Sequence, residues 1–294
     1  MNEIIKVGYL LSYDYQYVFN SLKLVYDFAD KIVLCYDKDG KTWAGNDIHI
    51  PSSFFEEIKK IDIKNKISFY AESFHIENTP PMSLETRQRN MLAEKLGKGG
   101  WHIQIDSDEY PVDFRELTSF LRKHKYLLKN PEKTPVNFFV KFITLFKQTE
   151  KGFFVISPYT EPCFLITNQP NYKNARFPKN DFHIILDSYI IHQSWARDEE
   201  EILKKITNWG HKNDFDTKKF FDFWKNLNED NCSSLQNFHP LYPTDWKSVK
   251  FINAKNIEEA IDFFKTSKEF ADKKITLSFK GKKRLIKLYL KSLF

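Results

Sequence analysis

The stretch WHIQIDSDE, residues 101–109, combines the pattern of a buried strand with an acidic turn. Apolar residues occupy every second position from Trp101 to Ile105, so they face one side of an extended chain. Asp106 and Asp108, separated by a single residue, stand where this strand ends. The stretch therefore predicts a strand inside a sheet, with two carboxylates at its carboxyl end.

Strand and helix patterns alternate on the N-terminal side of this stretch. Residues 4–11, 31–36 and 67–70 are short apolar runs, typical of strands buried on both faces. Residues 17–29 carry apolar side chains at helical spacing, and residues 83–96 carry helix start and stop signals. This alternation predicts a doubly wound, Rossmann-like α/β sheet, which binds ligands at the carboxyl ends of its parallel strands.

Length and composition narrow the class of protein. The 294 residues are 41% hydrophobic, enough to bury a full core, which excludes a disordered chain and a small disulfide scaffold. The excess of 45 Lys and Arg over 39 Asp and Glu is too small to indicate a nucleic-acid partner. Three widely spaced cysteines indicate a reducing compartment, and neither a signal peptide nor an apolar run of roughly 20 residues is evident. We therefore expect a cytoplasmic protein that binds no nucleic acid.

The pattern changes after the acidic turn. Residues 136–156 predict a β-hairpin, and residues 184–191 predict a further strand. Asp198 and Glu201 form a capping box at the start of the next helix. His211, near the end of that helix, is expected to interact with the negative helix end.

The last part of the chain has a different character. Amphipathic helices are predicted near residues 218–227 and 257–264, and a basic tail follows. We therefore expect one α/β domain over residues 1–212 and a helical C-terminal extension over residues 213–294.

Two neighbouring carboxylates on a turn indicate a particular chemistry. Both are costly to keep ionised unless a cation or hydrogen-bond donors neutralise them. Mg²⁺ in proteins is commonly held by one or two carboxylates together with phosphate oxygens. The turn at Asp106 and Asp108 therefore indicates a carboxylate–metal–diphosphate site, and the alternative is a solvated turn without function.

Four features, in this order along the chain, resemble the GT-A glycosyltransferases, and among them the family-2-type bacterial enzymes of surface-polysaccharide and lipopolysaccharide synthesis. They are a strand–helix–strand unit ending at Asp37, ETRQRN at residues 85–90, IDSDEYP at residues 105–111, and His192 after a later strand. The resemblance covers about residues 4–212. It implies a GT-A fold and a metal-dependent transferase that moves a sugar from a nucleotide-diphosphate donor, with UDP expected, to a glycan or lipid-linked acceptor.

The resemblance also implies which residues bind the nucleotide. Asp37 would hold the base or ribose, and Asp106 would contact the ribose or the metal. Arg87 and Asn90, three residues apart on one helix face, would meet the base and diphosphate. Arg89 is an alternative to Arg87 in this role. Each of these side chains can instead be an ordinary turn or surface residue.

The cation implied by the resemblance is Mn²⁺ or Mg²⁺. Its ligands would be Asp106, Asp108 and His192, with Asp108 as the main ligand and a catalytic residue. A neutral imidazole is a reasonable ligand for Mn²⁺. The alternative for His192 is a structural role.

An inverting transferase needs a base that takes the proton of the acceptor hydroxyl. The candidates are Glu161, Asp181 and Asp187, and Glu161 ranks first because prolines flank it closely. The motif that usually supplies the base in GT-A glycosyltransferases is not visible in this sequence. Inversion and retention of the configuration at the anomeric carbon therefore both stay open. Arg176 is a candidate for binding an acidic acceptor or the diphosphate.

The basic tail, residues 282–291, contains no acidic residue. As a helix, the tail would carry a stripe of lysines, Lys283, Lys287 and Lys291. A stripe of apolar residues, Ile286, Leu290 and Leu293, would lie on a different side. Such a helix can lie peripherally on the anionic inner face of a membrane, where lipid-linked acceptors sit. The alternative is a terminal helix docked on the protein with its lysines in water.

Two other functions compete with glycosyl transfer. A sugar nucleotidyltransferase has a similar sheet, but it usually carries a glycine-rich loop after the first strand, and residues 12–15 contain no glycine. A non-catalytic basic binding protein would gather its lysines and arginines on one face.

Overall fold

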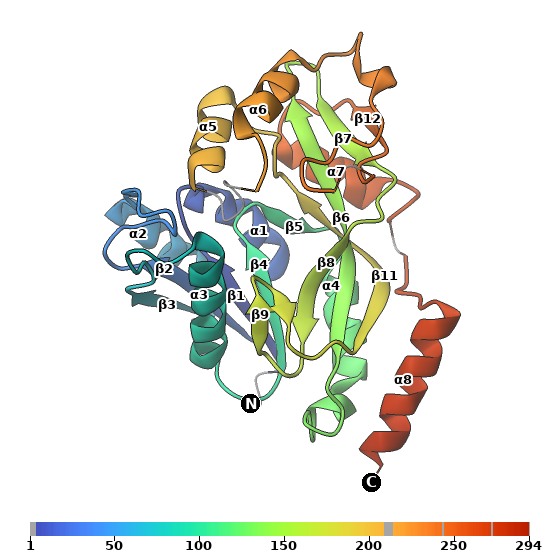
Figure 1. The fold of residues 1–294 in the computed structure, drawn as a ribbon. Coiled ribbons are helices and arrows are strands. Elements are labelled where there is room, and N and C mark those ends of the chain that lie inside the picture. The colour runs from blue at the N-terminus through green and yellow to red at the C-terminus, as the bar shows by residue number, and fades with distance from the viewer. Residues whose placement is uncertain (1–3, 209–213, 243, 272, 294) are drawn as a thin grey trace.

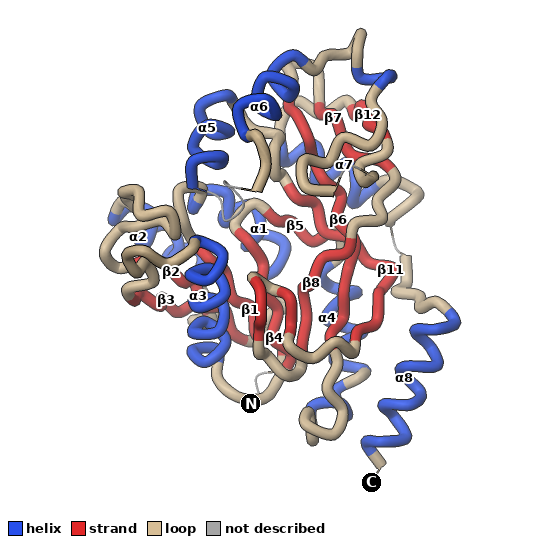
Figure 2. Tube along the Cα trace, viewed as in Figure 1, coloured by secondary structure: helices blue, strands red, loops and turns tan. Residues whose placement is uncertain are grey.

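The computed structural model describes residues 4–208, 214–242, 244–271 and 273–293. It shows an α/β fold in which helices surround a curled, ten-stranded mixed sheet (Figures 1 and 2). The strands of this sheet are β1 (Ile5–Leu10), β2 (Lys31–Asp37), β3 (Ile67–Glu72), β4 (Trp101–Asp106), β5 (Glu109–Pro111), β6 (Asn137–Gln148), β7 (Phe153–Ser157), β8 (Pro162–Thr167), β11 (His183–His192) and β12 (Ser248–Ile252). The strands β9 (Tyr172–Asn174) and β10 (Phe177–Pro178) pair separately.

Eight α-helices and three short 3₁₀ turns lie among the described residues. The helices are α1 (Val18–Val25), α2 (Ser52–Ile61), α3 (Pro81–Leu96), α4 (Phe114–Lys123), α5 (Glu199–Asn208), α6 (Thr217–Asn226), α7 (Ile257–Thr266) and α8 (Phe279–Ser292), and the 3₁₀ turns are η1 (Tyr15–Tyr17), η2 (Lys125–Leu128) and η3 (Cys232–Ser234).

The N-terminal strands form the predicted parallel sheet, in the order β3-β2-β1-β4. Beyond β4 the sheet becomes mixed, because β8 runs antiparallel to both β4 and β6. β11 runs parallel to β6 and pairs its carboxyl end with the short strand β5, antiparallel. The expected α/β class is thus confirmed, and the carboxyl ends of β1, β2 and β4 meet at one edge of the sheet.

Helix α3 packs closely on one face of the parallel strands. Gly8 of β1 makes this possible, because a Cβ at this position would lie 2.8 Å from Leu92 and 3.1 Å from Leu96. The helix starts at Pro81 and not at the expected Ser83. Proline suits this first helical position because its missing N–H needs no partner there.

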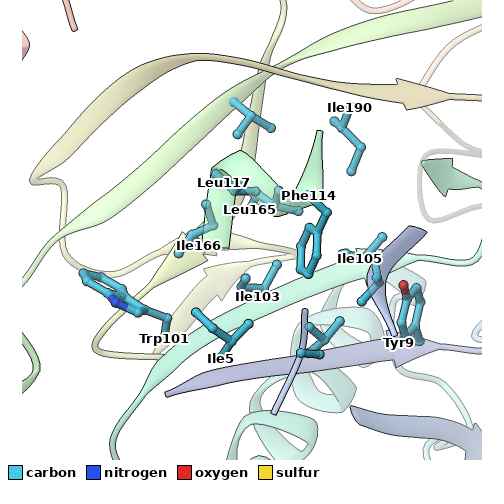
Figure 3. Close-up of a cluster of buried hydrophobic side chains, with 14 of the residues drawn as sticks. Ile5, Tyr9, Trp101, Ile103, Ile105, Phe114, Leu117, Leu165, Ile166 and Ile190 are labelled. Atoms are coloured by element: carbon cyan, nitrogen blue, oxygen red, sulfur yellow. The ribbon is translucent and has the colours of Figure 1, made fainter. Parts of the chain in front are cut away.

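The alternation of β4 distributes its side chains between two layers, as predicted. Trp101, Ile103 and Ile105 belong to the main core with residues of α1, α2 and α4 (Figure 3). The Trp101 indole donates to the Leu121 carbonyl of α4 at 2.9 Å. On the opposite face, Gln104 donates to the Arg89 carbonyl of α3 at 2.8 Å.

The C-terminal segment, expected to be helical, is helical only in part. Its strand β12 pairs antiparallel with β7 and extends the main sheet. Trp224 and Trp246 from this segment share a buried cluster with Phe146 and Trp195. Residues on both sides of the expected boundary at residue 212 therefore fill the same cores.

Helix α5 begins as predicted, with the backbone N–H of Glu201 donating to Asp198 Oδ1 at 2.8 Å. His211, which was expected to interact with the negative end of this helix, lies outside the described residues. No described helix is both long and apolar enough to cross a bilayer.

Candidate functional site

A cavity of about 730 Å³ opens at the carboxyl ends of β1, β2 and β4. Leu10, Asp37 and Asp106 from these strand ends line it, together with Arg176 in the β9–β10 turn and Lys205 of α5. Its size is within the usual range for small-molecule sites. The predicted acidic turn therefore lies in a cavity, at the sheet edge where α/β proteins bind ligands.

The pairing of β5 with β11 brings Asp108 and His192 together. His192 lies opposite Glu109 in the antiparallel register, and the Gln193 N–H donates to the Asp108 carbonyl at 2.9 Å. As a result, His192 Nε2 is 3.6 Å from Asp108 Oδ2. Both side chains line the cavity, as the proposed metal ligands should.

Asp108 is also held by a cation that the sequence analysis missed. Arg197, five residues after His192, donates to Asp108 and reaches Asp14 at 2.9 Å. Burial opposes the charge of Asp108, but His192, Arg197 and Lys205 together keep the pKa of that carboxyl below its usual range. Asp108 is therefore ionised at neutral pH.

His192 is neutral at the same pH. Burial lowers the pKa of the imidazole to about 4, although the neighbouring Asp108 opposes this effect. The adjacent ring of Phe142, 4.9 Å from the imidazole between centroids, helps to exclude water. A neutral ring can bind a metal through a nitrogen lone pair.

Asp106 is neutralised by a different arginine. Arg89 Nη2 lies 2.9 and 3.1 Å from the two oxygens of Asp106, and its guanidinium also bonds Glu85. Burial opposes ionisation of Asp106, but Arg89 and Arg176 keep the pKa of this carboxyl below its usual value. Of the two predicted alternatives on α3, Arg89 and not Arg87 thus reaches the acidic turn.

The predicted metal ligands fit a divalent cation in part. Asp108 and His192 are close enough to share one ion, and an ionised carboxylate with a neutral imidazole suits Mn²⁺. Asp106 is already bonded through both oxygens, and the described residues contain no cluster of three or more His, Cys, Asp or Glu that could hold a metal. Two of the three predicted ligands thus lie side by side, but the Asp108 oxygen nearest His192 also accepts from Arg197, and a metal at this site stays a prediction.

Asp37 lines the cavity, but four backbone N–H groups occupy its carboxylate. One oxygen accepts from Asp39 and Lys41, and the other from Phe74 and His75, at 2.7 to 3.2 Å. A carboxylate has about four acceptor positions. The structure thus gives Asp37 a role in fixing two loops, and nucleotide contact stays a prediction.

Arg87 and Asn90 do not line the cavity. Arg87 donates to the Ser73 carbonyl at 2.9 Å. Asn90 both accepts from the backbone of Tyr172 at 2.9 Å and donates to it at 3.1 Å. They fix loops at the edge of the site, and direct contact with a nucleotide stays a prediction.

Arg176 lines the cavity while forming a buried ion pair. Its guanidinium makes two 2.6 Å hydrogen bonds to Glu109, which has no exposed surface. It also donates to the Gln104 carbonyl at 3.1 Å. Arg176 therefore anchors the β9–β10 loop to the strand end that carries the acidic turn.

Glu161 lines a second cavity, of about 180 Å³. Its carboxylate accepts from the Trp246 indole at 3.2 Å and from Thr144 at 3.4 Å. Burial raises the pKa of Glu161, against the effect of these two donors. Phe142 lines both cavities, and Thr144 is the register partner of His192, so Glu161 lies close behind the wall of the main site.

The backbone next to Glu161 is strained. Trp246, which holds the carboxylate, has φ +55°, a conformation that costs a residue with a side chain on the order of 1 kcal/mol or more. Strained residues of this kind cluster at functional sites. The other acidic candidates, Asp181 and Asp187, form ion pairs with Lys173 and with Lys141.

Comparisons with known proteins leave the family open. A scan of protein-family models and a search of curated proteins give no match. Among solved structures, mannose-6-phosphate isomerase from Helicobacter pylori matches with 18% identity and a TM-score of 0.30. The match covers 53% of this chain and 56% of that chain, little more than half of its length. Similarity of this degree carries no argument about function.

Proposed function

We propose that the protein is a metal-dependent glycosyltransferase of the GT-A type, which transfers a sugar from a nucleotide-diphosphate donor, most simply a UDP-sugar, to a glycan or lipid-linked acceptor. The observation that carries the proposal is the 3.6 Å approach of His192 to Asp108 in the wall of the large cavity. These residues come from distant parts of the chain, and together they present a ligand pair for a cation at the sheet edge that binds nucleotides in related architectures.

Basic side chains also line the cavity, beside the carboxylates with which Arg89 and Arg176 are paired. Lys41, Arg89, Lys173, Arg176 and Lys205 all line it. Trp43 and Tyr13 add aromatic surface, which suits a nucleotide base or a sugar ring. This mixture of cations, acids and aromatic rings favours an anionic, partly aromatic ligand.

In the proposed reaction, Asp108 and His192 would hold the cation and so help to position the diphosphate of the donor. A bound Mn²⁺ or Mg²⁺ would supply electrostatic stabilisation of the departing diphosphate. Arg89 holds Asp106 in place, and Arg197 holds Asp108, so neither carboxylate must reorganise when the donor binds.

We propose Glu161 as the base that takes the acceptor proton. Its raised pKa makes it a better proton acceptor than an exposed carboxylate. The second cavity would hold the acceptor, and its hydroxyl would reach the donor once the Phe142 side chain, which lines both cavities, moves aside.

Thermal denaturation with nucleotides tests the proposal. UDP, GDP and CMP are each added with and without Mn²⁺, and one of them should raise the melting temperature only when the metal is present. Binding at 100 times the dissociation constant adds about 2.7 kcal/mol of stability. Consumption of a nucleoside triphosphate with release of pyrophosphate would instead identify a nucleotidyltransferase. Absence of any nucleotide effect would favour a non-catalytic binding protein.

Glu161→Gln is expected to lower the transfer rate by about 100-fold while leaving metal-dependent nucleotide binding unchanged, because general base catalysis contributes at least this factor. In the unmodified enzyme, activity should fall as the pH drops through the pKa of Glu161, which burial places above the usual glutamate value of 4.5. Glu150→Gln, at the exposed tip of the neighbouring hairpin, is the control. A Glu161→Gln enzyme with full activity would exclude Glu161 as the base.

Nucleotide affinity is expected to fall by up to about 10-fold between pH 7 and pH 9. The reason is Lys205, whose pKa is lowered to about 8 by burial and by Arg197, against the opposing carboxylates of Asp108, Asp14 and Asp106. Its ammonium is present below that pH and lost above it, so attraction for a diphosphate weakens as the pH rises. Calorimetric titration with UDP and Mn²⁺ measures the effect.

The Lys205→Met variant should bind more weakly at pH 7 and show little further change up to pH 9. Lys204→Met alters the exposed neighbour on the same helix and should behave like the unmodified protein. An equal pH dependence in all three proteins would show that Lys205 does not contact the nucleotide.

A further inference from the structure

Positive charge is concentrated at the C-terminus. The last 22 residues, 273–294, contain eight Lys and Arg and no acidic residue, whereas the other 272 residues hold 37 Lys and Arg against all 39 acids. The positive net charge of the chain therefore comes from this segment alone. Most of these cations lie on α8, at the edge of the molecule beside β11 (Figure 1).

One side of α8 packs on the protein. Gly281 and Leu288 are buried there, and Arg284 donates to the His183 carbonyl at the start of β11. Tyr289 packs edge-on against Tyr126 of η2, with ring centroids 5.3 Å apart. These contacts fix α8 on the rest of the protein, as expected for the alternative of a docked terminal helix.

The other side of α8 is apolar and exposed. Phe279, Ile286, Leu290 and Leu293 are 53 to 74% exposed. Their spacings of seven, four and three residues place them in one stripe along the helix. Exposing a large apolar side chain to water is unfavourable. A continuous stripe of four such side chains therefore indicates a surface that binds a partner or a membrane.

Lysines border this apolar stripe on both sides. They are Lys280, Lys282, Lys283, Lys287 and Lys291, and within the described part of the chain none of them forms an ion pair with a carboxylate. Lys283 lies over the Phe279 ring, 4.5 Å from its centroid. The Lys283 stem thus extends the apolar surface, and the other lysines add positive charge beside it, Lys282 on one side of the stripe and the rest on the other.

We infer that the outward face of α8 docks on an anionic lipid surface, with the apolar stripe inserted between headgroups and the lysines paired with lipid phosphates. The argument is charge complementarity, because interfacial helices of this composition bind anionic bilayers through buried apolar area and lysine attraction together. A second copy of the chain is a poor occupant, since it would place lysines against lysines. This inference is independent of the proposed transferase activity.

Flotation of the full chain with vesicles tests the inference. Vesicles of equal parts phosphatidylglycerol and phosphatidylcholine should carry the protein, vesicles of phosphatidylcholine alone should not, and high salt should release it. Two triple variants remove one contribution each: Ile286→Ser with Leu290→Ser and Leu293→Ser, and Lys283→Gln with Lys287→Gln and Lys291→Gln. Each should bind the anionic vesicles at least about 10-fold more weakly.

Matched controls come from exposed residues elsewhere. Ile63→Ser removes a side chain that is 79% exposed, and the triple variant Lys59→Gln, Lys60→Gln and Lys98→Gln removes the same charge from other surfaces. Both should bind like the unmodified protein, and all variants should melt at similar temperatures. Binding that is absent in the unmodified protein, or that survives both α8 variants, overturns the inference. A dimer that the serine variant dissociates would instead identify a second copy as the occupant.

Discussion

Asp108→Asn is expected to abolish the metal-dependent stabilisation by nucleotide and to lower sugar transfer at least about 1,000-fold. Asparagine keeps the shape of aspartate but loses the charge that attracts a cation next to His192. Electrostatic stabilisation by a bound metal is worth several kcal/mol in a transition state, and 4 kcal/mol corresponds to about 1,000-fold in rate. Melting curves with UDP and Mn²⁺, together with a transfer assay, measure both effects.

Two controls distinguish the loss of metal binding in Asp108→Asn from a folding defect. The variant loses one partner of Arg197, but Asp14 still pairs with that arginine, so the protein should fold. Its melting temperature without ligands checks this point. Asp39→Asn changes an exposed aspartate two residues after Asp37, whose side chain accepts from the half-buried Ser73, and it should keep full metal dependence. Retention of the Mn²⁺ effect in Asp108→Asn would remove the metal site from the proposed mechanism.

The alternation of strands and helices was predictable because each element has its own local pattern of apolar residues in the sequence. Strands β1, β2 and β4 are buried on both faces and read as continuous or alternating apolar runs. The position of Asp106 at a strand end followed directly from this pattern. By contrast, β5 has only three residues, too few for any period to show.

The contact between Asp108 and Arg197 was not predictable in the same way. It depends on the antiparallel register of β5 with β11, which joins residues that lie 79 to 83 positions apart. The choice between Arg87 and Arg89 had a local signal. Leu84, Gln88 and Leu92 recur every fourth position and mark the side of α3 that is buried, and Arg89 adjoins this side.

Arg176→Met is expected to destabilise the fold by about 3–5 kcal/mol, a large part of the stability of an ordinary domain. Removing Arg176 leaves the fully buried Glu109 without its bidentate partner. Urea denaturation measures the loss. Lys173→Met is the matched control in the same loop, because Lys173 forms an exposed pair with Asp181 that is worth at most about 1 kcal/mol.

The pH dependence of this variant separates an unpaired charge from lost packing. Burial raises the pKa of Glu109 even with Arg176 beside it, and without the arginine the pKa should rise further. A carboxyl with a raised pKa in the folded state binds a proton more readily there than in the unfolded chain, so its penalty shrinks as the pH falls. The stability deficit of Arg176→Met should therefore be smaller at pH 5 than at pH 8. A deficit that is equal at both values, or no larger than that of Lys173→Met, would show that the ion pair does not hold the β9–β10 loop on the acidic turn.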